Sequence, residues 1–106
     1  MIKYTTPAIS LLVEGKDLTG QDVYVSLEQG KTKLMKTGTD LVMTVTEEGT
    51  EIVFTLSQTE SAMFDYGKSV SIQVNFINSS GVRDATESKS IGVMRNLLDE
   101  EIAYGD

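Results

Sequence analysis

Cysteine, histidine and tryptophan are absent from this 106-residue chain, and there is a single proline. Without cysteine or histidine, the chain has no disulfide framework and no Cys or His metal site. The missing imidazole also excludes Ser–His and Cys–His nucleophile pairs and a histidine proton shuttle. What remains is an ordinary globular composition, 40% hydrophobic and 24% charged, of a length that suits one domain.

Positively charged residues are scarce as well. Nine basic residues face sixteen acidic ones, which gives a net charge of −7. Nucleic acids require a basic footprint, and anionic membranes repel an acidic surface, so we expect neither as a partner. The closest basic group is Lys31, Lys33 and Lys36, which we interpret as a solvated hairpin or, alternatively, as protection of an edge strand.

Long hydrophobic runs are missing too. No segment approaches the ~20 apolar residues of a membrane-spanning helix, and the first residues do not have the pattern of a signal peptide. We therefore expect a soluble protein that is made in the cytoplasm.

Alternation of apolar and polar residues is the dominant pattern. It predicts half-buried antiparallel strands, because successive side chains of a strand point to opposite faces. Within one segment Leu41, Met43 and Val45 are expected to share the inner face. The predicted strands are residues 22–28, 41–46, 50–56 and 70–76, with a further strand over about 83–94 and a hairpin into 32–36.

Turn signals separate these segments, as in Glu47-Glu48-Gly49. Short strands at such spacing are typical of a sandwich. The sequence thus predicts an all-β, Ig-like antiparallel β-sandwich of about seven strands, formed by residues 1–95 as a single domain.

One stretch breaks the alternation. Ser57 and Glu60 have the spacing of a capping box, which predicts a short helical turn at about 57–65. Met63 and Phe64 would tuck under the sheet edge; the alternative is a loop that contacts a ligand. Tyr66 follows, at the place where a tyrosine corner pins the connection in sandwich domains.

The last segment, residues 96–106, is acidic and does not alternate. We expect a tail that is flexible or docks on a partner, with Leu97, Leu98 and Ile102 able to share one face of a short helix. Aromatic side chains in the termini and on the polar face of a strand have no evident role in the core. The candidate partner-contact residues are therefore Tyr4, Tyr24, Leu97, Leu98, Ile102 and Tyr104.

Candidate chemistry is sparse. The adjacent pair Glu47 and Glu48 is interpreted as a solvated acidic turn, because neighbouring carboxylates in a turn point into water. A loose calcium site that uses Asp17, Asp22 or Asp40 is an open alternative. We predict no catalytic residue, no cofactor, no resident metal and no small-molecule ligand, and hence no enzyme.

Two stretches carry a resemblance to a known family. One begins Asp17-Leu18-Thr19-Gly20; the other runs from Leu56-Ser57-Gln58-Thr59-Glu60 to Val70-Ser71-Ile72-Gln73, followed by Gly81-Val82-Arg83-Asp84 and Asn96-Leu97-Leu98. Together they resemble small Ig-like domains of phages and prophages of Gram-positive bacteria, and they are similar to the N-terminal domain of siphophage baseplate upper proteins.

This resemblance implies a non-enzymatic structural or assembly protein of the virion, in a tail or baseplate, that packs against other virion proteins or against itself. The chain lacks the long C-terminal extension of a full baseplate protein, so the resemblance does not extend to host binding. A carbohydrate or cell-surface binding module with a β-sandwich fold is the alternative function, although such modules use exposed aromatic rings and here tryptophan is missing.

Overall fold

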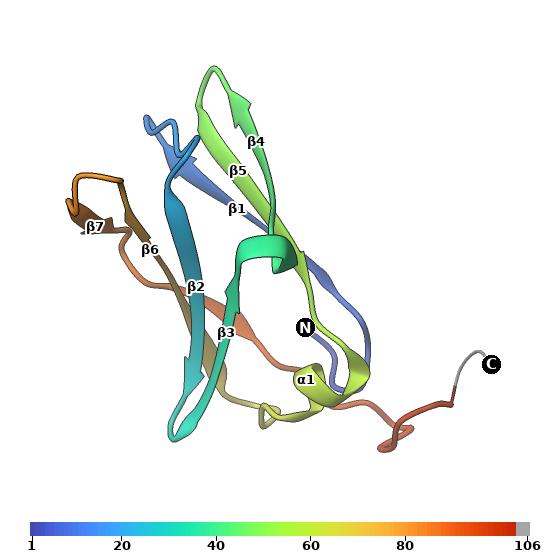
Figure 1. The fold of residues 1–106 in the computed structure, drawn as a ribbon. Coiled ribbons are helices and arrows are strands. Elements are labelled where there is room, and N and C mark those ends of the chain that lie inside the picture. The colour runs from blue at the N-terminus through green and yellow to red at the C-terminus, as the bar shows by residue number, and fades with distance from the viewer. Residues whose placement is uncertain (104–106) are drawn as a thin grey trace.

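The computed structural model describes residues 1–103 and is an all-β structure with two antiparallel sheets (Figure 1). Eight strands and two short helical segments follow one another in this part of the chain. They are β1 (Ala8–Glu14), β2 (Asp22–Gln29), β3 (Thr32–Thr37), η1 (Gly38–Asp40), β4 (Val42–Thr46), β5 (Gly49–Thr55), α1 (Gln58–Ala62), β6 (Ser69–Ile77), β7 (Arg83–Ala85) and β8 (Lys89–Gly92).

The first sheet has the strand order β1-β5-β4. The second has the order β3-β2-β6, and β7 and β8 both pair with the far edge of β6. Over residues 1–103, these orders match the B-E-D and C′-C-F-G parts of an immunoglobulin sandwich, with no strand in the place of A. The predicted all-β fold is therefore confirmed, and the strand order is compatible with the predicted Ig-like sandwich.

The core lies between the sheets, and it is formed by the apolar residues that alternate with polar ones along the strands. Val23, Val25 and Leu27 of β2 face inward, as do every second residue of β5 and β6. Some core residues come from the connections between strands: Leu18, for example, is fully buried, and its N–H donates to Thr50 Oγ1 at 3.1 Å. The buried apolar residues are Val13, Leu18, Val23, Val25, Leu27, Ile52, Phe54, Leu56, Phe64, Val70, Ile72, Val74, Phe76 and Val93.

Gly49 starts β5 where two strands approach closely. Its φ is +147°, and a Cβ atom there would lie 2.1 Å from the carbonyl oxygen of Val13 in β1. Only glycine fits this backbone conformation and this contact. The turn at Glu47 and Glu48, which precedes it, is exposed to solvent as predicted.

The strand predicted over 83–94 is interrupted. Residues 86–88 separate β7 from β8, and the side-chain Oγ1 of Thr86 accepts from the N–H of Val74 at 3.1 Å. The N–H of Thr86 donates to the Val74 carbonyl, and Gln73 Nε2 donates to the Thr86 carbonyl. Between β7 and β8, the backbone N–H of Val74 in β6 is therefore hydrogen-bonded by a side chain where a neighbouring strand would supply a carbonyl. Strand alternation in the sequence does not predict this contact.

The connection from α1 to β6 corrects the tyrosine-corner prediction. Tyr66 is 56% exposed, so it does not pin the corner. Gln29, at the end of β2, does so instead: its Oε1 accepts from the Asp65 N–H at 2.7 Å, and its Nε2 donates to the Asp65 carbonyl at 2.9 Å. Of the pair expected to tuck inward, Phe64 is fully buried, whereas Met63 remains exposed.

Candidate interaction surfaces

The helical turn α1 has the cap that the sequence predicts. Ser57 Oγ accepts from the Glu60 N–H at 3.1 Å, and Glu60 Oε1 accepts from the Ser57 N–H at 2.9 Å. At the other end of the turn, the buried Ser61 donates its hydroxyl proton to the Thr5 carbonyl at 2.7 Å. The turn is therefore fixed both by its own cap and by the N-terminal segment.

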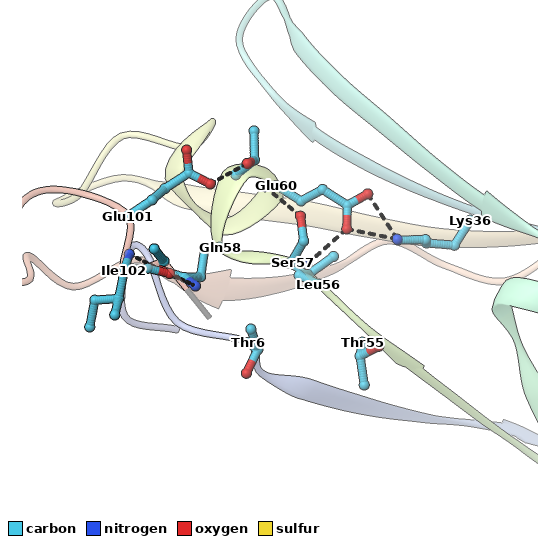
Figure 2. Close-up of a pocket in the computed structure, with 11 residues that line it drawn as sticks. Thr6, Lys36, Thr55, Leu56, Ser57, Gln58, Glu60, Glu101 and Ile102 are labelled. Atoms are coloured by element: carbon cyan, nitrogen blue, oxygen red, sulfur yellow. Dashed lines mark hydrogen bonds and ion pairs between the residues drawn. The ribbon is translucent and has the colours of Figure 1, made fainter. Parts of the chain in front are cut away.

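Glu60 also binds Lys36 of β3. Lys36 Nζ lies 2.8 Å from both carboxylate oxygens, and its side chain is only 13% exposed (Figure 2). Partial burial by itself raises the pKa of the Glu60 carboxyl group, but hydrogen bonds from Lys36 and from the Ser57 backbone outweigh it and hold the pKa below its ordinary value. The interpretation of Lys36 as a solvated residue is therefore wrong: it ties β3 to α1.

The C-terminal segment runs back to the same turn. Gln58 Nε2 donates to the Ile102 carbonyl at 2.9 Å, and the Ile102 N–H donates to Gln58 Oε1 at 2.6 Å (Figure 2). Thr59 donates its hydroxyl proton to the Glu101 carboxylate. One amide side chain thus satisfies both polar backbone groups of Ile102, as a neighbouring strand would.

The N-terminal residues meet the beginning of this segment. Ile2 pairs in parallel with Met94, and Asn96 Nδ2 donates to the Lys3 carbonyl at 2.9 Å. Residues 3–5, α1 and residues 96–103 are therefore joined at one end of the sandwich, which we call the α1 end. None of the predicted strands includes residues 1–7, because a parallel bridge such as that of Ile2 and Met94 has no local sequence signal.

The α1 end contains an open hollow of about 1290 Å³, lined by β5, α1 and the tail (Figure 2). Its charged groups are already engaged, since Lys36 binds Glu60, and Glu101 accepts from Thr59. A lowered pKa keeps the Glu60 carboxyl group ionised, which is the reverse of what a general acid needs near neutral pH. The arrangement holds β3, α1 and the C-terminal segment together.

The α1 end collects four of the predicted partner-contact residues. Tyr4 is half-buried there, with a φ of +63° and its ring 5.9 Å from Lys3 Nζ. Leu97 is 90% exposed, and Leu98 and Ile102 are exposed as well. The predicted short helix does not form within residues 96–103, because the segment follows the hydrogen bonds of Gln58. Tyr104 lies outside the described residues.

Tyr24 lies elsewhere, on the outer face of the second sheet. It is opposite Thr37 of β3 and Asn75 of β6, next to a shallow depression of about 390 Å³. Arg83 donates to Asn75 Oδ1 from Nε at 3.3 Å and from Nη2 at 3.0 Å. An aromatic ring, an amide and a guanidinium group therefore line one depression on the outer face of the second sheet.

Strand β4 is a third surface, one that the sequence did not single out. Met43 is opposite the buried Ile52 and Val45 opposite the buried Thr50, so both are on the core face of their sheet, as predicted. Both nevertheless remain exposed, and Val42 on the other face is 65% exposed. The second sheet does not extend far enough to cover this strand, and sequence alternation cannot show that.

Two of the three aspartates of the calcium alternative serve in local turns. Asp17 accepts from the Thr19 N–H at 2.9 Å, and the hydrogen bonds from the Thr19 side chain and backbone lower the pKa of its carboxyl group. Asp40 accepts from the Thr37 N–H at the start of η1. Over residues 1–103, no group of three or more acidic side chains is placed to hold a metal ion.

No family model matches the chain, and no curated protein or solved structure matches it either. The resemblance to phage Ig-like domains therefore stays a prediction. No helix within the described residues has the length and apolar character needed to cross a membrane.

Proposed function

We propose that this protein is a non-enzymatic structural or assembly component of a phage or prophage particle, of the tail or baseplate type, and that it acts by packing against other particle proteins or against copies of itself. The α1 end is the proposed contact surface. The sequence resemblance is the reason for proposing a phage particle, and the exposed tail is the reason for placing the contact at the α1 end.

The tail is the observation that carries this proposal. Gln58 and Thr59 hold residues 101 and 102 in place through polar contacts, while Leu97, Leu98 and Ile102 remain exposed. Apolar side chains that are positioned but uncovered are typical of protein–protein contact sites. Exposed leucines do not help solubility, so a tail that served only to keep the protein soluble would not be expected to carry them.

The test compares two full-length variants with the unchanged chain. Leu97→Ser/Leu98→Ser removes apolar side chains from the α1 end, and Val82→Ser removes an exposed apolar side chain from the turn between β6 and β7. We expect purified particles from the producing host to contain the unchanged chain and the Val82 variant, but several-fold less of the leucine variant. Particles that lack the unchanged chain, or that contain all three proteins equally, would refute the proposal.

A second candidate, a carbohydrate-binding module, is favoured by one observation, the face that carries Tyr24, Asn75 and Arg83. Sugar rings stack on aromatic side chains and bind amide and guanidinium groups through hydroxyls. Cell-wall polysaccharide titrated into the protein would separate the two functions. Saturable binding that is lost in Tyr24→Ala would favour the binding module, and absence of binding would remove it.

A further inference from the structure

β3 and β4 are the free edge strands of the two sheets on the side where η1 connects them (Figure 1). Within the described residues, β3 pairs with β2 alone and β4 pairs with β5 alone. An unpaired edge presents a row of backbone donors and acceptors to which another strand can add.

The two edges have opposite charges near their ends. The exposed Lys31 and Lys33 lie at the beginning of β3, and Lys33 has only a weak, exposed contact of 4.0 Å with Glu28. The exposed Glu47 and Glu48 lie at the end of β4, which itself carries no charge. In antiparallel pairing the beginning of one strand meets the end of the other, so the two lysines and the two glutamates would lie at the same end of the joint.

The side chains agree with the same register. When Lys31 of one copy is opposite Glu48 of another, Leu34 is opposite Val45 and Met35 is opposite Thr44. Leu34 and Val45 each point to the core face of their own sheet, because they pair with Leu27 and Thr50. The two core faces would thus be continuous across the joint, and the exposed Val45 would be covered.

We propose that copies of this chain associate head to tail, with β3 of one copy added antiparallel to β4 of the next. The inference rests on the proposed function and names its contact between copies. Because the two surfaces differ, a pair of copies still has one free edge of each kind, and the assembly grows into a ring or an open filament rather than stopping at a dimer. A two-fold β4–β4 contact is disfavoured, because pairing centred on Thr44 places Asp40 of each copy opposite Glu48 of the other.

Charge reversal tests the contact in the full-length protein. One variant is Lys31→Glu/Lys33→Glu and the other is Glu47→Lys/Glu48→Lys; all four side chains are exposed, and Lys68→Glu is the control. Sedimentation velocity at increasing concentration should show assembly of the unchanged chain and of the control. Each reversed variant alone should associate roughly ten-fold more weakly or worse, because like charges then meet at the joint.

Mixing supplies the decisive outcome. An equimolar mixture of the two reversed variants pairs opposite charges again, so we expect assembly to return. Circular dichroism of each variant shows whether the fold is kept. Assembly that survives both reversals, or that fails to return in the mixture, would overturn the β3–β4 contact and leave the α1 end untouched. A chain that stays monomeric at every concentration would also overturn it, whereas the proposed function is judged separately by the particle content.

Discussion

The two free edges on one side of the sandwich, β3 and β4, are built differently although they are close in the chain. β3 contains Lys33 and Lys36, and the second of these crosses to Glu60 and ties the strand to α1. β4 contains no charged residue, and its five residues are all exposed. Lysines on an edge resist the addition of a second edge of the same charge, whereas they attract an edge that is uncharged along its strand and acidic at its end. The contrast indicates that β3 is fixed in place by its own domain and that β4 is left available.

The strongest way to break the contrast is to displace the β4–β5 hairpin from β1. Gly49→Ala places a Cβ atom on the Val13 carbonyl oxygen, so β5 and the β4 hairpin cannot dock as they do now. We expect a loss of about 4 kcal/mol or more in the free energy of unfolding, measured by urea denaturation. Gly15→Ala is the matched control: its φ is also positive, at +70°, but no atom lies within 4 Å of the added Cβ, so only about 1 kcal/mol should be lost. Equal losses would contradict the close contact at Gly49.

The second prediction compares the two lysines of β3. Lys36→Met keeps the aliphatic stem but leaves the Glu60 carboxylate partly buried without its cation, and should cost about 2 kcal/mol in urea denaturation. Lys33→Met removes an ammonium group whose side chain is 72% exposed, and should change stability by less than about 0.5 kcal/mol. Equal effects would show that Lys36 is not the tie between β3 and α1.

The pH dependence of that tie has a definite sign. The pKa of Glu60 is lower in the folded protein than its ordinary value of 4.5, so the unfolded chain binds the proton more tightly. The contribution of Glu60 to stability is therefore complete above pH 4.5 and is lost as the pH falls below it. The stability difference between the unchanged protein and Glu60→Gln should be largest at neutral pH and shrink in acid. A difference that grows in acid would contradict the assignment.

The smallest expected effect concerns the tail. Gln58→Ala removes both hydrogen bonds to the Ile102 backbone, yet these are exposed, so global stability should change by less than about 1 kcal/mol. Hydrogen exchange at the Ile102 amide should nevertheless accelerate clearly, because its acceptor is gone. Gln21→Ala is a control in a distant loop. Unchanged exchange at Ile102 would mean that Gln58 does not position the tail.

Whether a feature of the fold can be predicted from the sequence depends on how far apart in the sequence the interacting residues lie. Period-two alternation predicts β2, β5 and β6, and the Ser57–Glu60 spacing predicts the capped turn, because both are local patterns. The roles of Lys36, Gln29 and Gln58 depend on partners 24 to 44 positions away. No local pattern reports such pairings, so these residues were missed. The exposure of β4 was missed for the same reason, since it depends on how far the opposite sheet extends.

The most direct test of the available edge is a charge placed in the middle of β4. Thr44→Lys adds an exposed ammonium group to β4, and Ser10→Lys adds the same group to β1, the opposite edge of the same sheet. Sedimentation velocity of the full-length proteins should show that Ser10→Lys assembles like the unchanged chain and that Thr44→Lys remains monomeric. If Thr44→Lys assembles as the unchanged chain does, β4 is not the edge through which copies meet.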